Sequence, residues 1–576
     1  MGLTLGLAAV SLFAEQTATK NPAANDAYKA GTAAVAAGDL ARAEMEFQKA
    51  AKLSPDNAEM QLALGKVLLY RGDLAEAAIH MLAAINAKPD MAQAHFYLGQ
   101  ILSAQGEWEQ AVLQLREAAK LAPKDADPHR ALARAMSAQG NTPEALTEAK
   151  AAVDLTPKSA EAHDELGSLL AQNSQFAEAA KQFQAALQVN PQYQPAHFHL
   201  GVAYLNSGDL SGAQKQLTAA STMDAKDGRA FYYLGDVYQA SGDRDAAIVA
   251  YQQAADLLPD SPAVFTKLGL ALQRTTDMDG AAKAFRRVIE LVPSDAEAHN
   301  NLGLVLMQRG EGEAAVKEFQ KALELRPGDS GFLANLGIAY LQLSDFDAAE
   351  KKMREAIKVS PENASFHYDL ALALKLKDDL TAAIAEMQKS IELDPNLVDA
   401  YYTFGITLWQ QGEFPEAVTK LRRAIELKPD YAEAFYTLGT VLKQMNQLPD
   451  AAAALREAIR LQSTFAGAHT TLAAVLRQMG DTSAAESEAQ LGDALVKQKI
   501  GLQGATFATN SGKRMLDAGD LDGAISQFRT AIKLAPNLAV AHYQLALALS
   551  RKGEKQEAAT ELGRAKELDA KLAGNF

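Results

Sequence analysis

Apolar residues recur along this chain at the spacing of helical turns, in short segments separated by turn residues. One segment places Leu64, Gly65 and Leu68 at intervals of three or four, and the next does the same with Ala77, Met81 and Ala84. Such intervals put residues on one face of an α-helix. The pattern predicts pairs of amphipathic helices of about 13 residues, a length that is marginal for an isolated helix in water. Stacking between helices must therefore supply the stability.

The helix pairs repeat with a fixed period of 34 residues, which prolines mark most clearly. These prolines are Pro55, Pro89, Pro123, Pro157, Pro191, Pro259, Pro293, Pro327, Pro361, Pro395 and Pro429. Proline cannot continue a helix, so each one ends the second helix of a unit. Between the two helices most units have Gly, as at Gly72 and Gly412, and others have Ser174, Asp378 or Asn446. These residues tolerate the left-handed backbone that ends a helix. A period of this length predicts stacked copies of one small unit.

The units resemble the tetratricopeptide repeat (TPR) family, and its bacterial members in particular. The copy AEMQLALGKVLLYRGDLAEAAIHMLAAINAKPDM, residues 58–91, shows the family's small and apolar positions well. The resemblance spans residues 24–572, or about sixteen units and a five-residue spacer (16 × 34 + 5 = 549). It implies an all-α fold, a right-handed superhelical α-solenoid of tandem helix-turn-helix repeats.

The periodicity predicts four segments along the chain. Residues 1–23 hold an apolar, signal-like run and a linker, residues 24–499 a long array of about fourteen repeats, and residues 505–576 a C-terminal pair with a cap. We expect residues 500–504, with the sequence IGLQG, to form a hinge between the arrays, or else a harmless loop insertion. The run from Leu3 to Ala14 is too short to span a bilayer and has the length of a signal-peptide core. It is an export signal or an N-terminal cap.

Composition narrows the possible functions. The net charge is −15 and no dense basic stripe occurs, so we expect no nucleic-acid partner. Cysteine is absent, which excludes disulfides and cysteine catalysis. Gly512 and Lys513 are spaced wrongly for a phosphate loop. We find no catalytic constellation and expect a chain that is not an enzyme and needs no cofactor or metal.

Histidine occupies the fourth position of eight units, a column that invites comparison with a metal site. Its members are His95, His129, His163, His197, His299, His367, His469 and His542. Packed helices lie about 8–10 Å apart, whereas metal–nitrogen bonds are about 2 Å. We therefore interpret the column as core packing.

The family resemblance implies a binding groove on the face that carries positions five, nine, twelve and thirteen of each first helix. Between residues 364 and 478 this face combines apolar, aromatic, cationic and amide side chains, which is typical of a binding surface. The candidate residues are Tyr368, Leu372, Lys375, Tyr402, Ile406, Trp409, Gln410, Tyr436, Lys443, Gln444, Arg477 and Gln478. The alternative is that part of the tyrosine column is buried between repeats.

Two classes of function remain, with a third less supported. The first is a non-enzymatic scaffold that binds extended peptides or partner proteins in the groove. The second is an exported structural or assembly protein of the cell envelope, with self-association as one mode of action. The third is the regulatory region of a glycosyltransferase-like system, suggested by Asn300, Asn301 and Asn335. We expect a protein partner and no integral membrane span. Export to the periplasm or envelope follows if Met1–Ala14 is a signal peptide, and a cytoplasmic location otherwise.

Overall fold

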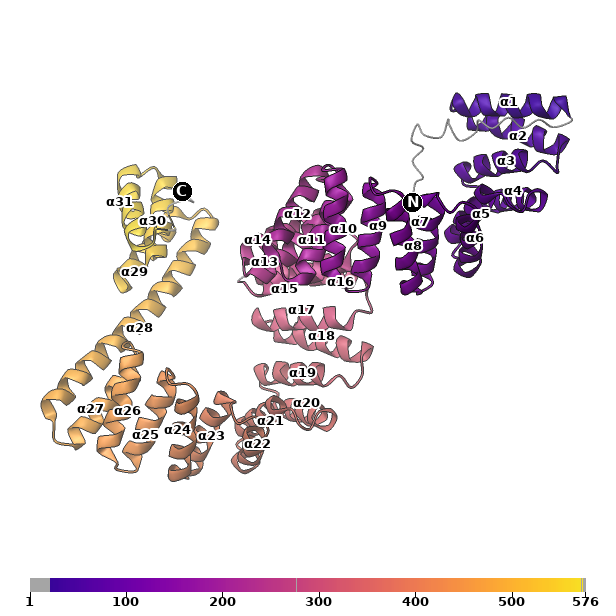
Figure 1. The fold of residues 1–576 in the computed structure, drawn as a ribbon. Helices are drawn as coiled ribbons and strands as arrows, with labels where there is room; N and C mark the ends of the chain where they lie inside the picture. The colour runs from indigo at the N-terminus through magenta and orange to yellow at the C-terminus, as the bar shows by residue number, and fades with distance from the viewer. Residues whose placement is uncertain (1–20, 276, 571, 573–576) are drawn as a thin grey trace. The chain divides into compact units, whose positions relative to one another are not determined.

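The computed structural model describes residues 21–275, 277–570 and 572. Across these residues the regular structure is helical: thirty-one α-helices occur and no strand. Consecutive helices form antiparallel hairpins that stack on the next hairpin (Figure 1). The expected all-α solenoid of tandem helix-turn-helix repeats is therefore confirmed. The signal-like run Leu3–Ala14 lies outside the described residues.

The chain divides into two compact units, residues 1–294 and 295–576. The first unit contains α1 (Pro22–Ala36), α2 (Leu40–Leu53), α3 (Ala58–Arg71), α4 (Leu74–Ala87), α5 (Ala92–Ala104), α6 (Trp108–Leu121), α7 (Ala126–Ala138), α8 (Thr142–Leu155), α9 (Ala160–Gln172), α10 (Phe176–Val189), α11 (Gln194–Ser207), α12 (Leu210–Met223), α13 (Gly228–Ser241), α14 (Arg244–Leu257), α15 (Pro262–Gln273) and α16 (Met278–Leu291).

The second unit contains α17 (Ala296–Gln308), α18 (Gly312–Leu325), α19 (Ser330–Gln342), α20 (Phe346–Val359), α21 (Ala364–Leu376), α22 (Leu380–Leu393), α23 (Val398–Gln411), α24 (Phe414–Leu427), α25 (Ala432–Gln444), α26 (Leu448–Leu461), α27 (Ala466–Gln478), α28 (Thr482–Asp517), α29 (Leu521–Leu534), α30 (Ala539–Lys552) and α31 (Lys555–Leu568).

The turn inside each hairpin uses left-handed backbone, as the sequence predicts. Gly72 and Gly412 have φ of 87° and 91°. Where glycine is absent, Ser174, Ser344, Asp378 and Asn446 take the same region at φ between 59° and 66°. Short polar side chains tolerate this geometry because they can hydrogen-bond locally. The predicted turn between the two helices of each hairpin is therefore confirmed.

A second glycine in most repeats allows the two helices of a hairpin to approach closely. A Cβ at Gly235 would lie 2.4 Å from a ring carbon of Tyr251, and a Cβ at Gly65 would lie 2.9 Å from the Cε of Met81. Both large partners are fully buried. The glycine on the first helix thus makes room for a large side chain 16 residues later on the second helix. This pairing fills the centre of each hairpin.

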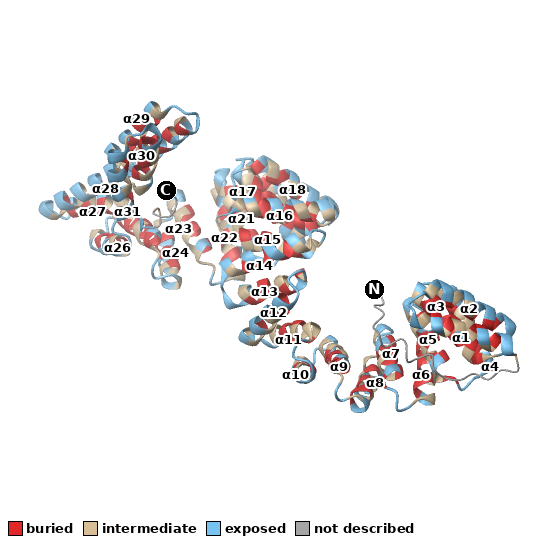
Figure 2. Cartoon of the chain, turned by 90° about the horizontal axis from the view of Figure 1, so that it is seen from above, coloured by how far each residue is buried: buried red, intermediate tan, exposed pale blue. Residues whose placement is uncertain are grey.

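Buried side chains follow the contacts between successive helices (Figure 2). On the second helices, one position that faces the next repeat is isoleucine or leucine in six consecutive units: Ile289, Leu323, Ile357, Ile391, Ile425 and Ile459. The same position is Asp493 in α28 and Lys566 in α31, and both are exposed. A charge at this position disfavours stacking of a further hairpin. The two charges therefore mark the ends of two stacks.

The helix α28 joins these two stacks as one element of 36 residues. Its first part serves as the second helix of the fourteenth repeat, and its last part as the first helix of the fifteenth. Residues 500–504 lie inside this helix, so the alternative of a loop insertion at IGLQG is wrong. No proline interrupts the segment, and the helix continues through Gly501 and Gly504. Whether the two arrays move about α28 as a hinge remains a prediction.

Five inserted helical residues redirect the buried face of α28. At about 100° per residue they turn the face by about 140° beyond one full turn. Ala485 and Gly492 are buried in the first part, whereas Ala505, Ala508 and Gly512 are buried in the second. The insertion therefore separates the arrays by rotation of the interface, without a loop.

The histidine column is part of the hydrogen-bonded core, which supports the packing interpretation. In α21, His367 Nδ1 lies 2.6 Å from Glu386 Oε2, and its Nε2 lies 3.0 Å from the carbonyl oxygen of Pro361. His469 and His542 make the same two contacts, each with a glutamate on the second helix of its hairpin and with a carbonyl oxygen in the preceding turn. The histidines thus tie both helices of a hairpin to the preceding turn. Among the described side chains, no group of three or more His, Asp or Glu could hold a metal ion.

Candidate functional site

The twelve predicted site residues all lie on consecutive first helices of the second unit. Their elements are α21, α23, α25 and α27. We call this surface the predicted groove, residues 364–478. Gln410, Gln444, Arg477 and Gln478 are exposed, while the tyrosines, Leu372, Lys375, Ile406, Trp409 and Lys443 are half-buried. The surface is therefore accessible along its amide and cationic edge and partly enclosed along its aromatic column.

The tyrosine column holds neighbouring repeats together. The hydroxyl of Tyr368 lies 3.3 Å from Thr403 Oγ1, and that of Tyr402 lies 3.4 Å from Thr437 Oγ1. The ring of Tyr402 also packs on Tyr431, with centroids 4.8 Å apart. Burial raises the pKa of Tyr368 above its usual value. These rings are therefore shared between repeat packing and the exposed surface.

Trp409 links two repeats at the rim of the predicted groove. Its Nε1–H donates to Gln444 Oε1 at 2.6 Å, which connects α23 with α25. The same position is a cation in the next two repeats, Lys443 in α25 and Arg477 in α27. Neither forms an ion pair with any described residue, so both charges remain available to a ligand. Tryptophan and arginine are enriched among interaction hot spots.

Asp369 in α21 is a site residue that the sequence analysis missed. Burial raises the pKa of its carboxyl to about 6. Burial also lowers the pKa of Lys375 on the same helix. The signal that could have found Asp369 is a second periodicity: polar residues 35 apart on successive first helices pair with each other.

The 35-residue spacing joins position five of one repeat to position six of the next. Arg130 donates to Glu165 through Nε and Nη2, both at 2.8 Å, and Asn335 Nδ2 donates to Asn300 Oδ1 at 2.8 Å. The residue 35 before Asp369 is Ala334, which has no polar group to offer. The carboxylate of Asp369 therefore lacks the partner that its position has in other repeats.

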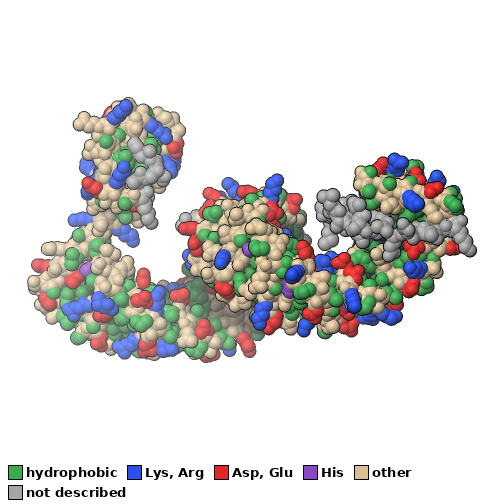
Figure 3. Space-filling view, turned by 45° about the horizontal axis from the view of Figure 1, so that its top comes forward, with side chains coloured by type: hydrophobic (Ala, Val, Ile, Leu, Met, Phe, Trp, Pro, Cys, Tyr) green, Lys and Arg blue, Asp and Glu red, His purple; other side chains and the backbone are tan. Residues whose placement is uncertain are grey.

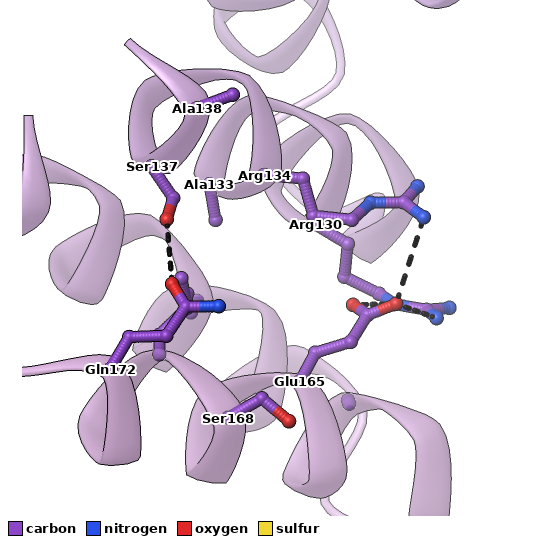
Figure 4. A pocket seen from close by; sticks show the side chains of 11 residues that line it. Arg130, Ala133, Arg134, Ser137, Ala138, Glu165, Ser168 and Gln172 are labelled. Atoms are coloured by element: carbon purple, nitrogen blue, oxygen red, sulfur yellow. Dashed lines mark hydrogen bonds and ion pairs between the residues drawn. The ribbon is translucent and has the colours of Figure 1, made fainter. Parts of the chain in front are cut away.

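A cavity between α7 and α9 is a second feature that the sequence analysis missed (Figure 4). Its volume is about 440 Å³, within the range of about 300–1,000 Å³ typical of ligand pockets. Its floor is apolar and its rim is polar. The floor consists of Ala133, Ala149, Ala162 and Leu169. The rim consists of Arg130, Arg134, Ser137, Glu165, Ser168 and Gln172.

Surface charge elsewhere is mixed. On the face drawn in Figure 3, Lys and Arg side chains are interspersed with Asp and Glu. None of the described helices combines the length and the apolar character that a membrane span requires. No single charged surface therefore dominates this face.

Family profiles match most of the chain. Profiles described as tetratricopeptide repeat match residues 28–91, 130–197, 169–236, 266–330, 318–351, 335–397 and 432–465. A profile described as TPR repeat matches residues 99–140, 235–275, 407–446 and 512–553. No curated protein matches the chain.

Solved structures with similar helical arrangements span part or most of the chain. YrrB, described as a TPR protein with an unusual peptide-binding site, is 28% identical over 33% of this chain and 97% of its own, with a TM-score of 0.29. The Cut9–Hcn1 hetero-tetramer of APC/C is 14% identical over 92% and 97%, with a TM-score of 0.35. MamA from Desulfovibrio magneticus RS-1 is 21% identical over 30% and 96%, with a TM-score of 0.28. Because these TM-scores are low, the assignment rests on the profile matches and on the repeat geometry: the chain belongs to the tetratricopeptide repeat family.

Proposed function

We propose that this protein is a non-enzymatic scaffold that binds an extended segment of a partner protein along the predicted groove, residues 364–478. Membership of the TPR family supports a protein–protein interaction scaffold in general. Two observations support this location: Trp409 pairs with Gln444, and the two cations at the same position of the next two repeats, Lys443 and Arg477, have no ion-pair partner among the described residues.

The side chains of the predicted groove define the chemistry of the partner. Half-buried Leu372 and Ile406 offer apolar contact along the middle of the strip. Exposed Gln410 and Gln478 can donate to and accept from an extended backbone, whose own groups are otherwise unpaired. Unpaired cations favour acidic residues and accelerate association. The partner segment is therefore extended, with apolar and acidic residues.

The two other functions keep a weaker basis. Export to the cell envelope depends on Met1–Ala14, which lie outside the described residues. The comparison with a glycosyltransferase-like system depends on Asn300, Asn301 and Asn335, and the amides of Asn300 and Asn335 are bonded to each other. Neither observation favours these functions over the scaffold.

The test is a binding titration with a partner isolated by pull-down on the full-length protein. The titration compares the wild type with Arg477→Glu and Trp409→Ala. Arg477 is exposed and forms no ion pair with the described residues, so its charge can be reversed without damage to the fold. Unchanged affinity in both Arg477→Glu and Trp409→Ala would show that the predicted groove is not the binding surface.

A further inference from the structure

The cavity between α7 and α9 exists because one large side chain is missing from the repeat pattern. The position that packs against the close-approach glycine is large and apolar in fourteen of the sixteen repeats. These residues are Phe47, Met81, Leu115, Phe183, Leu217, Tyr251, Phe285, Phe319, Met353, Met387, Leu421, Leu455, Phe528 and Leu562. The exceptions are Ala489 in α28 and Ala149 in α8.

In the fourth repeat both members of this pair are small. Ala133 occupies the position that is glycine in most repeats, and Ala149 is its partner on the second helix. Both residues line the cavity floor. The extra methyl group of Ala133 does not replace the missing side chain. In the eleventh repeat, Ala371 occurs with Met387, and both are fully buried. Alanine at the first position is therefore compatible with a large residue at the second, and Ala149 leaves the space empty.

The rim of this cavity carries two cations, of which one, Arg134, is held only by a long ion pair. Arg130 is occupied by its two bonds to Glu165 and by a contact of 3.5 Å to Asp127. Arg134 differs: its Nη1 lies 3.9 Å from Glu165 Oε1, its side chain is 60% exposed, and it makes no hydrogen bond with the described residues. Figure 4 shows both guanidinium groups on the same side of the cavity, with that of Arg130 beside the Glu165 carboxylate and that of Arg134 above it.

An apolar floor below an exposed guanidinium specifies a ligand with two features. An apolar side chain gains by covering the apolar floor of the cavity. A carboxylate gains charge-assisted, two-point hydrogen bonds with arginine. We propose that the α7–α9 cavity is a second peptide-binding site, which takes an apolar side chain of a partner protein while an adjacent Asp or Glu of that partner pairs with Arg134.

This site is independent of the predicted groove, because it lies on other repeats and in the other compact unit. Its occupant is an internal segment of a protein, since the acidic group and the apolar group can come from neighbouring residues of one chain. A free small carboxylic acid would satisfy Arg134 but would fill little of a cavity of about 440 Å³.

The test is selection of peptides from a random heptapeptide phage library on the immobilised full-length protein, followed by titration of the enriched peptide. We expect enrichment of sequences in which a large apolar residue is next to Asp or Glu. Two variants test the site. Ala149→Met fills the floor and copies the eleventh repeat, where Met387 packs with alanine at residue 371. Arg134→Glu reverses the charge at the rim. Each should weaken binding of the enriched peptide at least tenfold.

Matched controls separate this site from stability and from the predicted groove. Ala149→Met should keep or raise the melting temperature, because it fills a cavity, and Trp409→Ala should leave this peptide's affinity unchanged. Replacing the peptide's acidic residue by its amide, or its large apolar residue by Ala, should reproduce the losses. A library that yields no such motif, or a motif whose binding survives Ala149→Met and Arg134→Glu, overturns the proposal and leaves the cavity as a packing defect.

Discussion

His80 Nδ1 lies 2.7 Å from Gln61 Oε1, which joins the two helices of the second repeat, α4 and α3. The third repeat makes the same bond with the residue types exchanged: His95 is on the first helix and Gln114 on the second, at 2.7 Å. The exchange shows that the hydrogen bond, rather than histidine itself, is the recurring feature. Where the first position is Phe231, Phe265 or Phe435, the second is alanine. In these units the pair is polar–polar or aromatic–small, whereas Tyr401 with Lys420 and Leu333 with Lys352 follow neither rule.

This covariation predicts the stability of variants in α21 and α22. His367→Phe alone should lower the free energy of unfolding by about 1–3 kcal/mol, because Glu386 and the carbonyl of Pro361 each lose a hydrogen-bond partner. The double variant His367→Phe with Glu386→Ala copies the Phe231–Ala250 pair and should recover most of the loss. Urea unfolding of the wild type, both single variants and the double variant measures the coupling. Additive losses in the double variant would mean that the two positions act independently.

The buried carboxyl of Asp369 should make stability depend on pH. Because burial raises the pKa of Asp369 to about 6, the folded chain holds this proton where the unfolded chain releases it. This contribution to stability is complete at low pH and is lost as the pH rises from about 4 to about 6. Asp369→Asn, which stays neutral, should therefore be the more stable protein at pH 7, by about 1 kcal/mol after allowance for solvent contact.

The measurement is the urea midpoint of wild type and Asp369→Asn at pH 4.5, 5.5 and 7. The gap between the two proteins should widen with pH and level off near neutrality. Asp430→Asn, at an exposed position whose side chain makes no hydrogen bond or ion pair with the described residues, controls for loss of one negative charge. A gap that is constant across the three pH values would contradict a raised pKa.

Continuity of α28 predicts a strong effect of proline at residue 503. Gln503 is exposed in the middle of the helix, so Gln503→Pro removes a backbone hydrogen bond without removing a buried contact. Disruption of an internal helical turn should cost about 3 kcal/mol. Gln503→Ala is the control and should be neutral or slightly stabilising. Hydrogen exchange in residues 496–508 reports the outcome, and rapid exchange in the wild type would support a loop at IGLQG instead.

Within the predicted groove, Trp409→Ala should weaken binding of the partner segment by about 2 kcal/mol or more if the indole is a hot spot. Its only hydrogen bond with the described residues is to Gln444, so the melting temperature should fall little. Tyr402→Ala should lower both affinity and stability, because this ring packs on Tyr431. Tyr402→Phe keeps the ring and removes the hydroxyl near Thr437, and so separates packing from hydrogen bonding.

Charge at Lys443 should act mainly on the rate of association. Lys443→Ala should slow association and reduce its dependence on salt, since the cation acts over the distance of an encounter. Dissociation should change less. Stopped-flow mixing at two ionic strengths measures both rates. A change confined to dissociation would indicate that Lys443 makes a direct, desolvated contact.

The sequence by itself determined the repeat and its local geometry. Proline at every 34th residue and Gly, Ser, Asn or Asp in the hairpin turn predict helix ends from backbone chemistry alone, and Gly72 and Asn446 adopt the left-handed region as expected. The same local rules failed at residues 500–504, because a segment without strong breakers becomes helical when helices on both sides propagate into it.

Only the tertiary structure decided which side chains of the predicted groove and of the α7–α9 cavity are accessible to a partner. The sequence left open whether Tyr402 is exposed or buried between repeats. In the structure it is half-buried against the next repeat, because the packing of a solenoid side chain depends on a neighbour 29 or 35 residues away. The cavity at Ala149 likewise arises from two small residues that meet across a hairpin. Alanine is a good helix former and therefore gives no local signal of an empty space. Local propensity fixes where helices begin and end, whereas three-dimensional packing determines which cavities and charges remain for a partner.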